Sequence, residues 1–459
     1  MKFLTRSDAE DAELGIAERS AYMLGNAGTA LINTINASFV MFYYTDIIGL
    51  KAGIVGSILL FSRIFDGITD IIMGIITDHT HSKLGKGRVW ILRMCVPFAL
   101  SGILMMSVPC NTSEIFQYTY VFLTYNLCNS VCLTALYVPY NSMTYSLSSR
   151  PYERGILGVF VMFGAVFGTM FVNSTIDTWT KAMGNTAAAW RNVTIVYAMI
   201  GLTLHLICFF FTKERYQPDQ ENNQKNTVRE ELKSVLTNRY WLLAVGAVFL
   251  VMMFTGLLGS TGMYYAKAVL GSTADFAAVS NTLAVTQIVA LLVSFVPMKK
   301  IGKRNTILAA LFLISLGSMI LYFTGADLRA AVFCNAIRGI GAGLAGACGY
   351  GLVADTIDYG EWKSGIAASG IGMSSLTFVT KVSGGLSVSL VGMMIDRCGY
   401  EASAAVQAAP AVSSIHLFYT LIPMIFTLLA IILLLFYQLD GIYPKIRREL
   451  NERKLKGAK

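Results

Sequence analysis

The chain has 459 residues, of which 55% are hydrophobic and 14% are charged, and its mean hydropathy is +0.58. A soluble protein does not need so much apolar surface, and continuous apolar runs of about 20 residues exclude a β-barrel, whose strands alternate. The formal net charge of +9 comes from loops and tails, which is typical of membrane topology, and no nucleic-acid-binding motif accompanies it. The composition therefore predicts a polytopic, all-α membrane protein.

Twelve apolar stretches are predicted to span the membrane. In chain order they cover residues 20–45, 53–77, 90–109, 117–146, 155–174, 190–212, 241–268, 277–297, 305–324, 329–354, 366–394 and 412–437. Basic residues concentrate in the segments after the even-numbered spans, so these loops and both termini are predicted to be cytoplasmic in a cell (inner) membrane. The basic tail at 445–459 is expected to lie against the anionic lipid headgroups.

The second span carries three charged residues near its middle. Arg63, Asp66 and Asp70 are separated by three and four residues, so a helix places them on one face. A carboxylate at the bilayer centre costs about 3 kcal/mol, and two carboxylates beside one arginine leave a net negative charge. Such a site favours a cation, which indicates solute transport coupled to an ion.

The loop after this span reads GIITDHTHSKLGKGR and resembles the loop signature of the major facilitator superfamily. Asp78 is suited to pair at a helix end, and Lys83 and Arg88 face the cytoplasm, which predicts a gate that opens and closes. The alternative is that the basic residues only set the topology.

The two halves of the chain echo each other. SKLGKGR at 82–88 follows the second span and KKIGKRN at 299–305 follows the eighth, while a long hydrophilic loop at 212–239 divides the spans six and six. The pattern predicts the major facilitator fold with two pseudo-symmetric six-helix bundles. The predicted parts are a first bundle at 1–211, a cytoplasmic linker at 212–240, a second bundle at 241–438 and a basic tail at 439–459. The second half of the linker is expected to be either a short amphipathic helix or a plain flexible segment.

A second charge cluster follows the tenth span in the sequence ADTIDYGEWKSG. Asp355, Asp358 and Lys363 lie there, and Arg154 occupies the equivalent place after the fourth span. Opposite charges at pseudo-symmetric positions predict a further part of the gate, because a few kcal/mol suffice to bias two conformations.

The motifs together resemble one family. RIFDGITDIIMG with SKLGKGRVWIL, VPYNSM with SSRPYERG, and ADTIDYGEWKSG with TKVSGGL follow each other as in the glycoside–pentoside–hexuronide:cation symporters, which include melibiose and glucuronide permeases. The resemblance covers essentially the whole chain. It implies that Asp66 and Asp70 bind the coupling cation with help from Thr134. It also implies that Lys381, with Thr377 one turn before it, links the second bundle to the sugar or cation site.

The chain departs from the melibiose-type pattern at the sugar site. The first span has no acid, and Asn26, Thr29, Asn33 and Asn36 form a polar stripe there instead. On the fourth span, Tyr137 and Asn141 replace the expected acid and tryptophan. These departures make galactoside recognition doubtful and favour an anionic sugar, with Lys381 or Arg63 as the counter-charge. The alternative for the first-span stripe is hydrogen bonding between helices.

The expected function is cation-coupled symport of a sugar or sugar conjugate by alternating access. One alternative is a lipid or lysolipid transporter on the same fold, and another is a non-transporting membrane sensor. No nucleophile–base pair, metal-spaced cluster or phosphate loop is present, so neither an enzyme nor a metal site nor a cofactor is expected. The expected partners are a small sugar and membrane lipids, without nucleic acid, and the chain is expected to be a monomer. The sequence leaves open the identity of the sugar, Na⁺ or H⁺ as the ion, the direction of transport and the role of Arg338.

Overall fold

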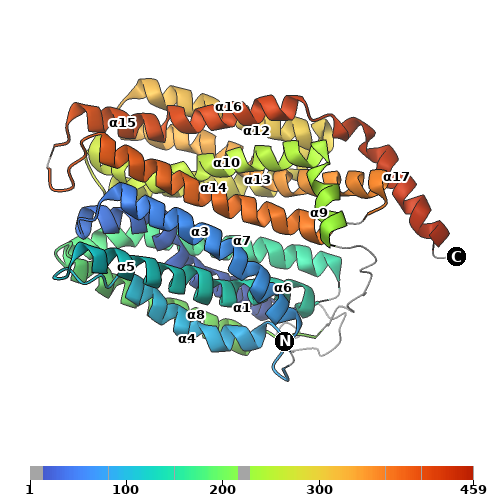
Figure 1. The fold of residues 1–459 in the computed structure, drawn as a ribbon, viewed down its shortest axis with the longest axis horizontal. Helices are drawn as coiled ribbons and strands as arrows, with labels where there is room; N and C mark the ends of the chain where they lie inside the picture. The colour runs from blue at the N-terminus through green and yellow to red at the C-terminus, as the bar shows by residue number, and fades with distance from the viewer. Residues whose placement is uncertain are drawn as a thin grey trace. The chain divides into compact units, whose positions relative to one another are not determined.

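The computed structural model describes residues 14–80, 82–148, 150–215, 228–366, 369–404 and 406–457, and Figure 1 shows helices throughout them. No strand occurs among these residues. Ten helical stretches are long and apolar enough to cross a membrane. They are α4 (Arg88–Met105), α5 to α6 (Glu114–Leu147), α7 (Pro151–Ala182), α8 (Ala187–Phe211), α10 with η4 (Arg239–Leu270), α11 (Asp275–Val293), α12 (Phe295–Thr324), α13 (Leu328–Ser364), α14 (Ser369–Arg397) and α15 to α16 (Ala409–Leu435).

Two further helical stretches precede these ten. The first consists of α1 (Ile16–Thr34), η1 (Ile35–Phe39), α2 (Val40–Phe42) and η2 (Tyr43–Ile47), where η denotes π-helical turns; the second is α3 (Ala52–Asp78). The middle of α3 carries the three charges of Arg63, Asp66 and Asp70. The ten stretches and these two are consistent with the twelve predicted spans, and the all-α fold class is confirmed.

Among the described residues, two helices lie outside the spans. The helix α9 (Val228–Leu236) confirms that the second half of the central loop is helical, although residues 216–227 of that loop lie outside the described residues. The helix α17 (Leu439–Gly457) forms most of the basic tail.

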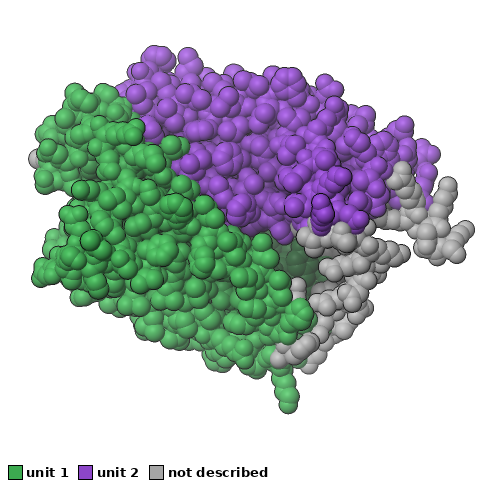
Figure 2. Space-filling view, in the orientation of Figure 1, with its two compact units in different colours: residues 1–220, 259–281, 388–415 green, residues 221–258, 282–387, 416–459 purple. Residues whose placement is uncertain are grey.

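Contacts between residues divide the chain into two compact units, which Figure 2 colours green and purple. Unit 1 comprises Met1–Gln220, Gly259–Asn281 and Val388–Ile415, and unit 2 comprises Glu221–Leu258, Thr282–Ser387 and His416–Lys459. Unit 1 therefore takes in two segments from the second half of the sequence. The predicted division into bundles at 1–211 and 241–438 remains a prediction.

Small residues bring the helices of each unit close together. In unit 1, a methyl group added at Gly28 of α1 would lie 2.9 Å from the Gly201 carbonyl oxygen of α8, and one added at Gly168 of α7 would lie 2.7 Å from the Ala27 carbonyl oxygen. In unit 2, a methyl group at Gly341 of α13 would lie 2.5 Å from the Ala310 carbonyl oxygen of α12. Close backbone approach at glycine is the usual way in which membrane helices gain packing energy, because lipid provides no hydrophobic drive between them.

The duplicated loops have the same backbone turn. Gly85 in SKLGKGR has φ +103° and Gly302 in KKIGKRN has φ +83°, a conformation that favours glycine. Gly302 also interrupts α12, so the predicted eighth and ninth spans are separate helices in their backbone geometry. The turns in the two units are therefore counterparts, as the internal repeat predicts.

An acidic residue closes each of these turns. In unit 1, the Glu214 carboxylate accepts hydrogen bonds from the backbone N–H groups of Lys86, Gly87 and Arg88 at 2.8–2.9 Å. In unit 2, Asp440 Oδ2 accepts a hydrogen bond from the Arg304 N–H at 2.9 Å. These acids satisfy N–H groups at helix starts, which otherwise have no partner within the helix.

The arginines of the two turns are also counterparts. Arg88 donates to the Phe209 carbonyl oxygen at 2.8 Å, and Arg304 donates to the Leu434 and Leu435 carbonyl oxygens at 2.8 Å. Each guanidinium thus binds the end of the last membrane span in its own half of the sequence, α8 or α16. The shared arrangement of glycine, acid and arginine is strong evidence for a duplicated unit.

We expect Glu214→Ala to destabilise the protein by about 1–3 kcal/mol, because three N–H groups would lose a charged acceptor. Asp440→Ala should have a smaller effect, since a single N–H bond to Asp440 is described. Thermal unfolding of the purified protein in detergent measures both changes. Glu452→Ala, which removes a 52% exposed side chain paired within α17, is the control and should leave the midpoint unchanged. An unchanged midpoint for Glu214→Ala would contradict the capping role.

Candidate functional site

The structure brings the two carboxylates of α3 together with Thr134 of α6 (Thr134–Leu147) inside unit 1. Thr134 Oγ1 lies 3.2 Å from Asp66 Oδ1, 3.0 Å from Asp70 Oδ1 and 3.3 Å from the Asn129 carbonyl oxygen. Asp66 and Thr134 are each 4% exposed, whereas Asp70 is only partly buried. One hydroxyl hydrogen cannot serve three acceptors at once, so oxygen lone pairs converge at this point.

Arg63 is the positive charge of this cluster. Its guanidinium lies 3.7 Å from Asp66 Oδ2 and 5.9 Å from the centre of the Tyr125 ring. Asn126 joins α5 to the residue before Arg63, because its Nδ2 donates to the Ser62 side-chain oxygen Oγ at 2.8 Å. Tyr125 and Asn126 end α5 (Glu114–Asn126), so α5 positions the arginine that accompanies the carboxylates.

A π-helical segment, η3 (Leu127–Leu133), directly precedes Thr134. Such turns are rare and are found frequently at functional sites. Here the segment carries Asn129, whose carbonyl oxygen lies in the cluster and whose Oδ1 accepts a hydrogen bond from Asn36 Nδ2 at 2.7 Å. Asn129, Asn126 and Tyr125 were not predicted from the sequence. Two asparagines within an apolar span were a signal, but the π turn that aims one of them cannot be read from the sequence.

The cluster offers a cation oxygen atoms from two carboxylates, a hydroxyl and a carbonyl. Oxygen ligands of this kind suit a hard cation, and the two carboxylates can equally share a proton. With Arg63 the formal charge is −1, which one bound Na⁺ or H⁺ would neutralise. Among the described residues, no group of three or more His, Cys, Asp and Glu is placed to hold a metal ion.

The polar stripe of the first span is divided between two roles. Asn26 donates to the Val161 carbonyl oxygen of α7 at 2.8 Å, and Thr29 lies 3.0 Å from His205 Nε2 of α8. Both side chains are buried and join helices within unit 1. Asn33 is exposed instead, so it is the stripe residue best placed to meet a solute. The alternative interpretation, hydrogen bonding between helices, describes the contacts of Asn26, Thr29 and Asn36.

Tyr137 and Asn141 lie one turn apart on α6, and both are exposed. Tyr137 is 37% exposed, and its ring stacks on Tyr140 with centroids 6.3 Å apart. Because Thr134 lies one turn before Tyr137, this exposed face of α6 begins beside the carboxylate cluster. Of the two residues that replace the family's acid and tryptophan, Tyr137 lies one turn and Asn141 about two turns after Thr134 on this helix.

Lys381 and Thr377 belong to unit 2 and lie one turn apart on α14. Lys381 is partly buried, and Thr377 is exposed with its hydroxyl donating to the Met373 carbonyl oxygen at 3.2 Å. A methyl group added at Gly384, one turn after Lys381, would meet no atom within 4 Å.

The helices α10 and α14 run parallel, which places Lys381 level with a pocket. A methyl group at Gly372 would lie 3.7 Å from Trp241 Nε1 near the start of both helices, and one at Gly256 would lie 2.8 Å from Ser387 Cβ further along. Lys381 lies six residues before Ser387, and the residue six before Gly256 is Leu250, which sets Lys381 level with the stretch of α10 from Val248 to Met252.

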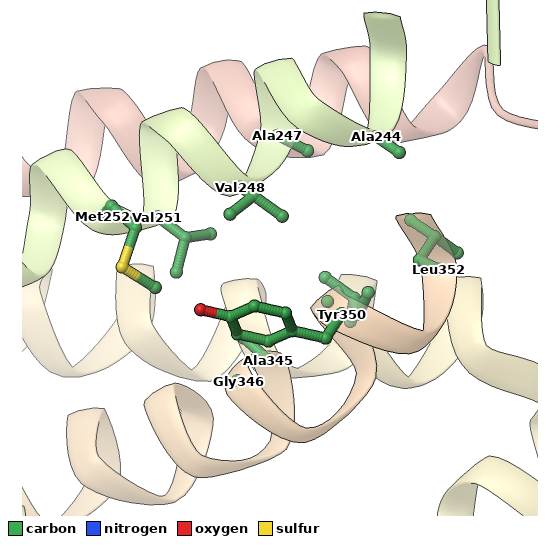
Figure 3. A pocket seen from close by; sticks show the side chains of 11 residues that line it. Ala244, Ala247, Val248, Val251, Met252, Ala345, Gly346, Tyr350 and Leu352 are labelled. Carbon is green, nitrogen blue, oxygen red and sulfur yellow. The ribbon is translucent and has the colours of Figure 1, made fainter. Parts of the chain in front are cut away.

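Met252 lines one end of this pocket, which is formed by α10, α12 and α13 in unit 2. Its walls are almost entirely apolar, and Figure 3 shows the Tyr350 hydroxyl directed to the side on which Val251 and Met252 lie. The lining residues are Ala244, Ala247, Val248, Val251, Met252, Ile307, Ala345, Gly346, Gly349, Tyr350 and Leu352. The pocket has room because most of these side chains are small, and a methyl group added at Gly346 would meet no atom within 4 Å.

Arg338, whose role the sequence leaves open, lies in the core of unit 2. Its side chain is 0% exposed, its Nε donates to Ser318 Oγ at 2.9 Å and its NH2 donates to the Tyr419 carbonyl oxygen at 2.7 Å. The guanidinium carbon also lies 5.2 Å from the Tyr419 ring centre and 5.9 Å from that of Phe254. These contacts join α12, α13, α15 (Ala409–Tyr419) and α10, so Arg338 holds four helices together within unit 2.

The residues predicted to form a gate after the second and fourth spans have contacts within unit 1. Arg88 binds the Phe209 carbonyl, and Arg154 Nε donates to the Ser148 carbonyl oxygen at 2.8 Å. Lys83 is exposed, and the side chain of Asp78 lies outside the described residues. The role of these residues in gating remains a prediction.

The predicted gate residues after the tenth span have contacts within unit 2. Asp355 pairs with Lys303 at 2.6 Å, and Asp358 Oδ2 accepts a hydrogen bond from the Tyr443 hydroxyl at 2.7 Å. Lys363 is exposed. The Asp355–Lys303 pair links α13 to α12 directly after the interruption at Gly302, in the duplicated loop. Their gating role also remains a prediction.

Comparison with known proteins gives consistent results. The family model described as MFS/sugar transport protein matches residues 21–441. The chain is 31% identical to the isoprimeverose transporter of Lactiplantibacillus pentosus, over 95% of this chain and 91% of that protein. It is 28% identical to the glucuronide carrier protein homolog of Escherichia coli, over 94% of this chain and 95% of that protein.

Solved structures of transporters share the fold. One is a nucleoside transporter, with a TM-score of 0.64 and 12% identity over 91% of this chain and 99% of that chain. Another is the Escherichia coli fucose:proton symporter, with a TM-score of 0.54 and 17% identity over 92% of this chain and 99% of that chain. At these identities the likeness shows the fold alone, which is that of a major facilitator.

Proposed function

The chain belongs to the family of MFS/sugar transport proteins, and we propose that the cluster of Asp66, Asp70 and Thr134 couples its sugar symport to a cation. The family makes the chain a multi-pass membrane transporter and not an enzyme. The observation that carries the coupling proposal is the Thr134 hydroxyl, which lies within 3.2 Å of an oxygen of each carboxylate. One cation bound there would contact both.

Arg63 is proposed to take part in the coupling. Before the cation arrives, the guanidinium partly neutralises Asp66 at 3.7 Å. Binding of Na⁺ or H⁺ neutralises the remaining charge, and a neutral site crosses the low-dielectric interior at much lower cost than a charged one. The cation site therefore favours movement only when it is occupied.

The proposed substrate is a glycoside, pentoside or hexuronide, and each unit by itself offers groups that can bind it. Tyr137, Asn141 and Asn33 offer neutral hydrogen-bonding groups for hydroxyls, and Lys381 offers a positive charge for an anionic sugar. The relatives named for isoprimeverose and glucuronide support sugar conjugates over lipids. A lipid substrate is not favoured.

The pocket level with Lys381 is proposed to hold the apolar part of a sugar conjugate, its aglycone. Its lining has almost no polar surface, so it favours an apolar group beside the Tyr350 ring over a hydroxyl-bearing one. We expect Gly346→Val to lower uptake of a sugar with a nitrophenyl aglycone about tenfold relative to the free sugar, because the new side chain fills the pocket.

Paired uptake assays with the nitrophenyl conjugate and its parent sugar measure this effect. Gly155→Val is the matched control, because a methyl group there also meets no atom within 4 Å and Gly155 lies in α7 of unit 1. Equal loss of both substrates in Gly346→Val would contradict an aglycone site.

The proposed orientation has both termini in the cytoplasm of an inner-membrane protein that acts as a monomer. The orientation is inferred from the basic loops after the even-numbered spans. The test of the function as a whole is uptake by purified protein in liposomes, with a panel of neutral and anionic sugars under separate sodium and proton gradients. Accumulation that requires one gradient identifies the ion, and absence of accumulation under both would contradict symport.

A further inference from the structure

A carboxylate outside the candidate cation site is the centre of a second polar cluster in unit 1. Asp46 Oδ1 accepts hydrogen bonds from Lys267 Nζ and from the Tyr400 hydroxyl, each at 2.6 Å, and Oδ2 accepts one from Thr45 Oγ1 at 3.0 Å. Thr45 Oγ1 in turn lies 2.6 Å from the Tyr264 hydroxyl. These five residues are called the end latch. Three of them come from the second half of the sequence.

The end latch is well shielded from solvent. The Asp46 side chain is 2% exposed and that of Lys267 is 25% exposed. The ammonium group lies 5.6 Å from the centre of the Phe42 ring and 5.5 Å from that of Tyr400. Burial and the nearby Asp46 carboxylate raise the pKa of Tyr400 well above its usual value, so its hydroxyl keeps its proton and donates to Asp46.

Asp46 and Lys267 occupy equivalent positions in the two halves of the duplicated chain. FYYTDIIG at 42–49 matches MYYAKAVLG at 263–271, with the aspartate aligned to the lysine. Asp46 lies in the π turn η2 and Lys267 in the π turn η4 (Ala266–Leu270), and each turn is followed by a glycine with positive φ, Gly49 or Gly271. The repeat therefore presents one structural motif twice with opposite charges, and the two charges bind each other.

Two neighbouring contacts join α3 to α14 in the same unit. The Gly53 N–H donates to Asp396 Oδ2 at 2.6 Å, and a methyl group at Gly56 would lie 3.1 Å from Ser389 Cα. The helices α10 and α14 both continue from unit 1 into unit 2. The end latch lies at the unit 1 end of α10, and the α3–α14 contact lies at the unit 1 end of α14. The rest of α10 and of α14 belongs to unit 2.

The chemistry of the end latch suits a contact that opens repeatedly. When a buried ion pair separates into water, each charge regains hydration, which offsets much of the lost attraction. An apolar contact would lose stabilisation in proportion to the area exposed. Removing one charge alone is different, because the other charge then stays buried without its counter-ion and the closed contact is strongly destabilised.

We propose that the end latch is a releasable closure that holds the transport path shut at this end of unit 1 and opens in every transport cycle. The inference rests on the proposed function in one respect, because it requires a chain that alternates between two conformations, each open to one side of the membrane. In this proposal Asp46, Lys267 and Tyr400 position helix ends. None of the three binds the sugar or the coupling cation.

The test measures exposure of Ser389, which is 1% exposed at the α3–α14 contact. The full-length parent carries Cys110→Ser and Cys398→Ser, because the other six cysteines are buried, and Ser389→Cys as the reporter. A membrane-impermeant maleimide is added to each side of native membranes in separate samples. We expect Asp46→Asn and Lys267→Met to increase the labelling rate about tenfold from one side, and Tyr400→Phe to increase it less.

Controls distinguish release of the latch from general loosening. Lys181→Met breaks an ion pair with Asp177 inside α7, at 2.8 Å, and should leave labelling unchanged. The exchange variant with Asp46→Lys and Lys267→Asp should return labelling toward the parent rate. If Asp46→Asn does not insert in the membrane, Lys267→Met and Tyr400→Phe decide the outcome.

Unchanged labelling in variants that insert normally would overturn the proposal, as would an equal increase in Lys181→Met. Rapid labelling of the parent would overturn it too, because the contact would not be closed. Labelling needs neither sugar nor a cation gradient, so its result can be interpreted even if the chain fails the uptake test for symport.

Discussion

Asp66→Asn is expected to abolish cation-driven sugar accumulation and reduce the ratio of internal to external sugar to about one, since an ion that no longer binds cannot contribute its gradient energy. The variant retains the shape of the side chain but removes a charge that is 4% exposed and faces Thr134 Oγ1 at 3.2 Å. Asp70→Asn should have the same effect, because its Oδ1 lies on the other side of that hydroxyl, at 3.0 Å. Uptake by proteoliposomes under the coupling gradient measures the ratio.

Three comparisons support this interpretation. Asp177→Asn removes a carboxylate that pairs with Lys181 within α7 and should accumulate sugar normally. Thr134→Val keeps both carboxylates and removes the hydroxyl between them, so it should weaken the apparent affinity for the cation more than the maximal rate. Sugar counterflow, which needs no gradient, shows whether the Asn variants still translocate. Full accumulation by both Asp66→Asn and Asp70→Asn would exclude this cluster as the cation site.

Lys381→Ala is expected to lower sugar transport about 10- to 100-fold, and counterflow should fall with it. A hydrogen bond to a charged group contributes about 1.5–3 kcal/mol, which corresponds to such a factor when the substrate is anionic. Loss of counterflow would place Lys381 at the sugar. Loss of accumulation with counterflow retained would instead link it to coupling. Initial rates and counterflow in the same proteoliposomes separate the two results.

Two further variants on α14 sharpen this test. Lys381→Arg keeps the positive charge and should retain transport of an anionic sugar better than Lys381→Ala. Thr377→Val removes the hydroxyl one turn away, which bonds to its own helix, and should have a smaller effect. Accumulation at the parent level by Lys381→Ala would remove this residue from the mechanism.

The sequence predicted the spans and the carboxylate cluster because both depend on local patterns. Long apolar runs identify membrane helices, and three charges at helical spacing identify one face of α3. The family resemblance added Thr134, and the structure places its hydroxyl between the two carboxylates. The duplicated loops SKLGKGR and KKIGKRN also fold alike, because each needs a glycine with positive φ at the same place.

Other parts of the site depend on contacts between distant residues. A polar residue on an apolar span can face a solute or a neighbouring helix, and the stripe pattern alone could not separate Asn33 from Asn26, which binds a backbone carbonyl of α7. The π turn before Thr134 has no sequence signature, so the position of the Asn129 carbonyl was not foreseen. The partners Glu214 and Asp440 lie far along the chain from the loops that they cap, and nothing local indicates them.

The opposite charges at Asp46 and Lys267 bear on the history of the chain. If its two halves descend from one duplicated segment, the first product carried the same residue at both positions. Two like charges in a shielded contact repel each other, so that ancestor could not have joined its helix ends through this ion pair. The end latch is therefore younger than the duplication, and it required the two copies to diverge in charge at a position where their backbones stayed alike.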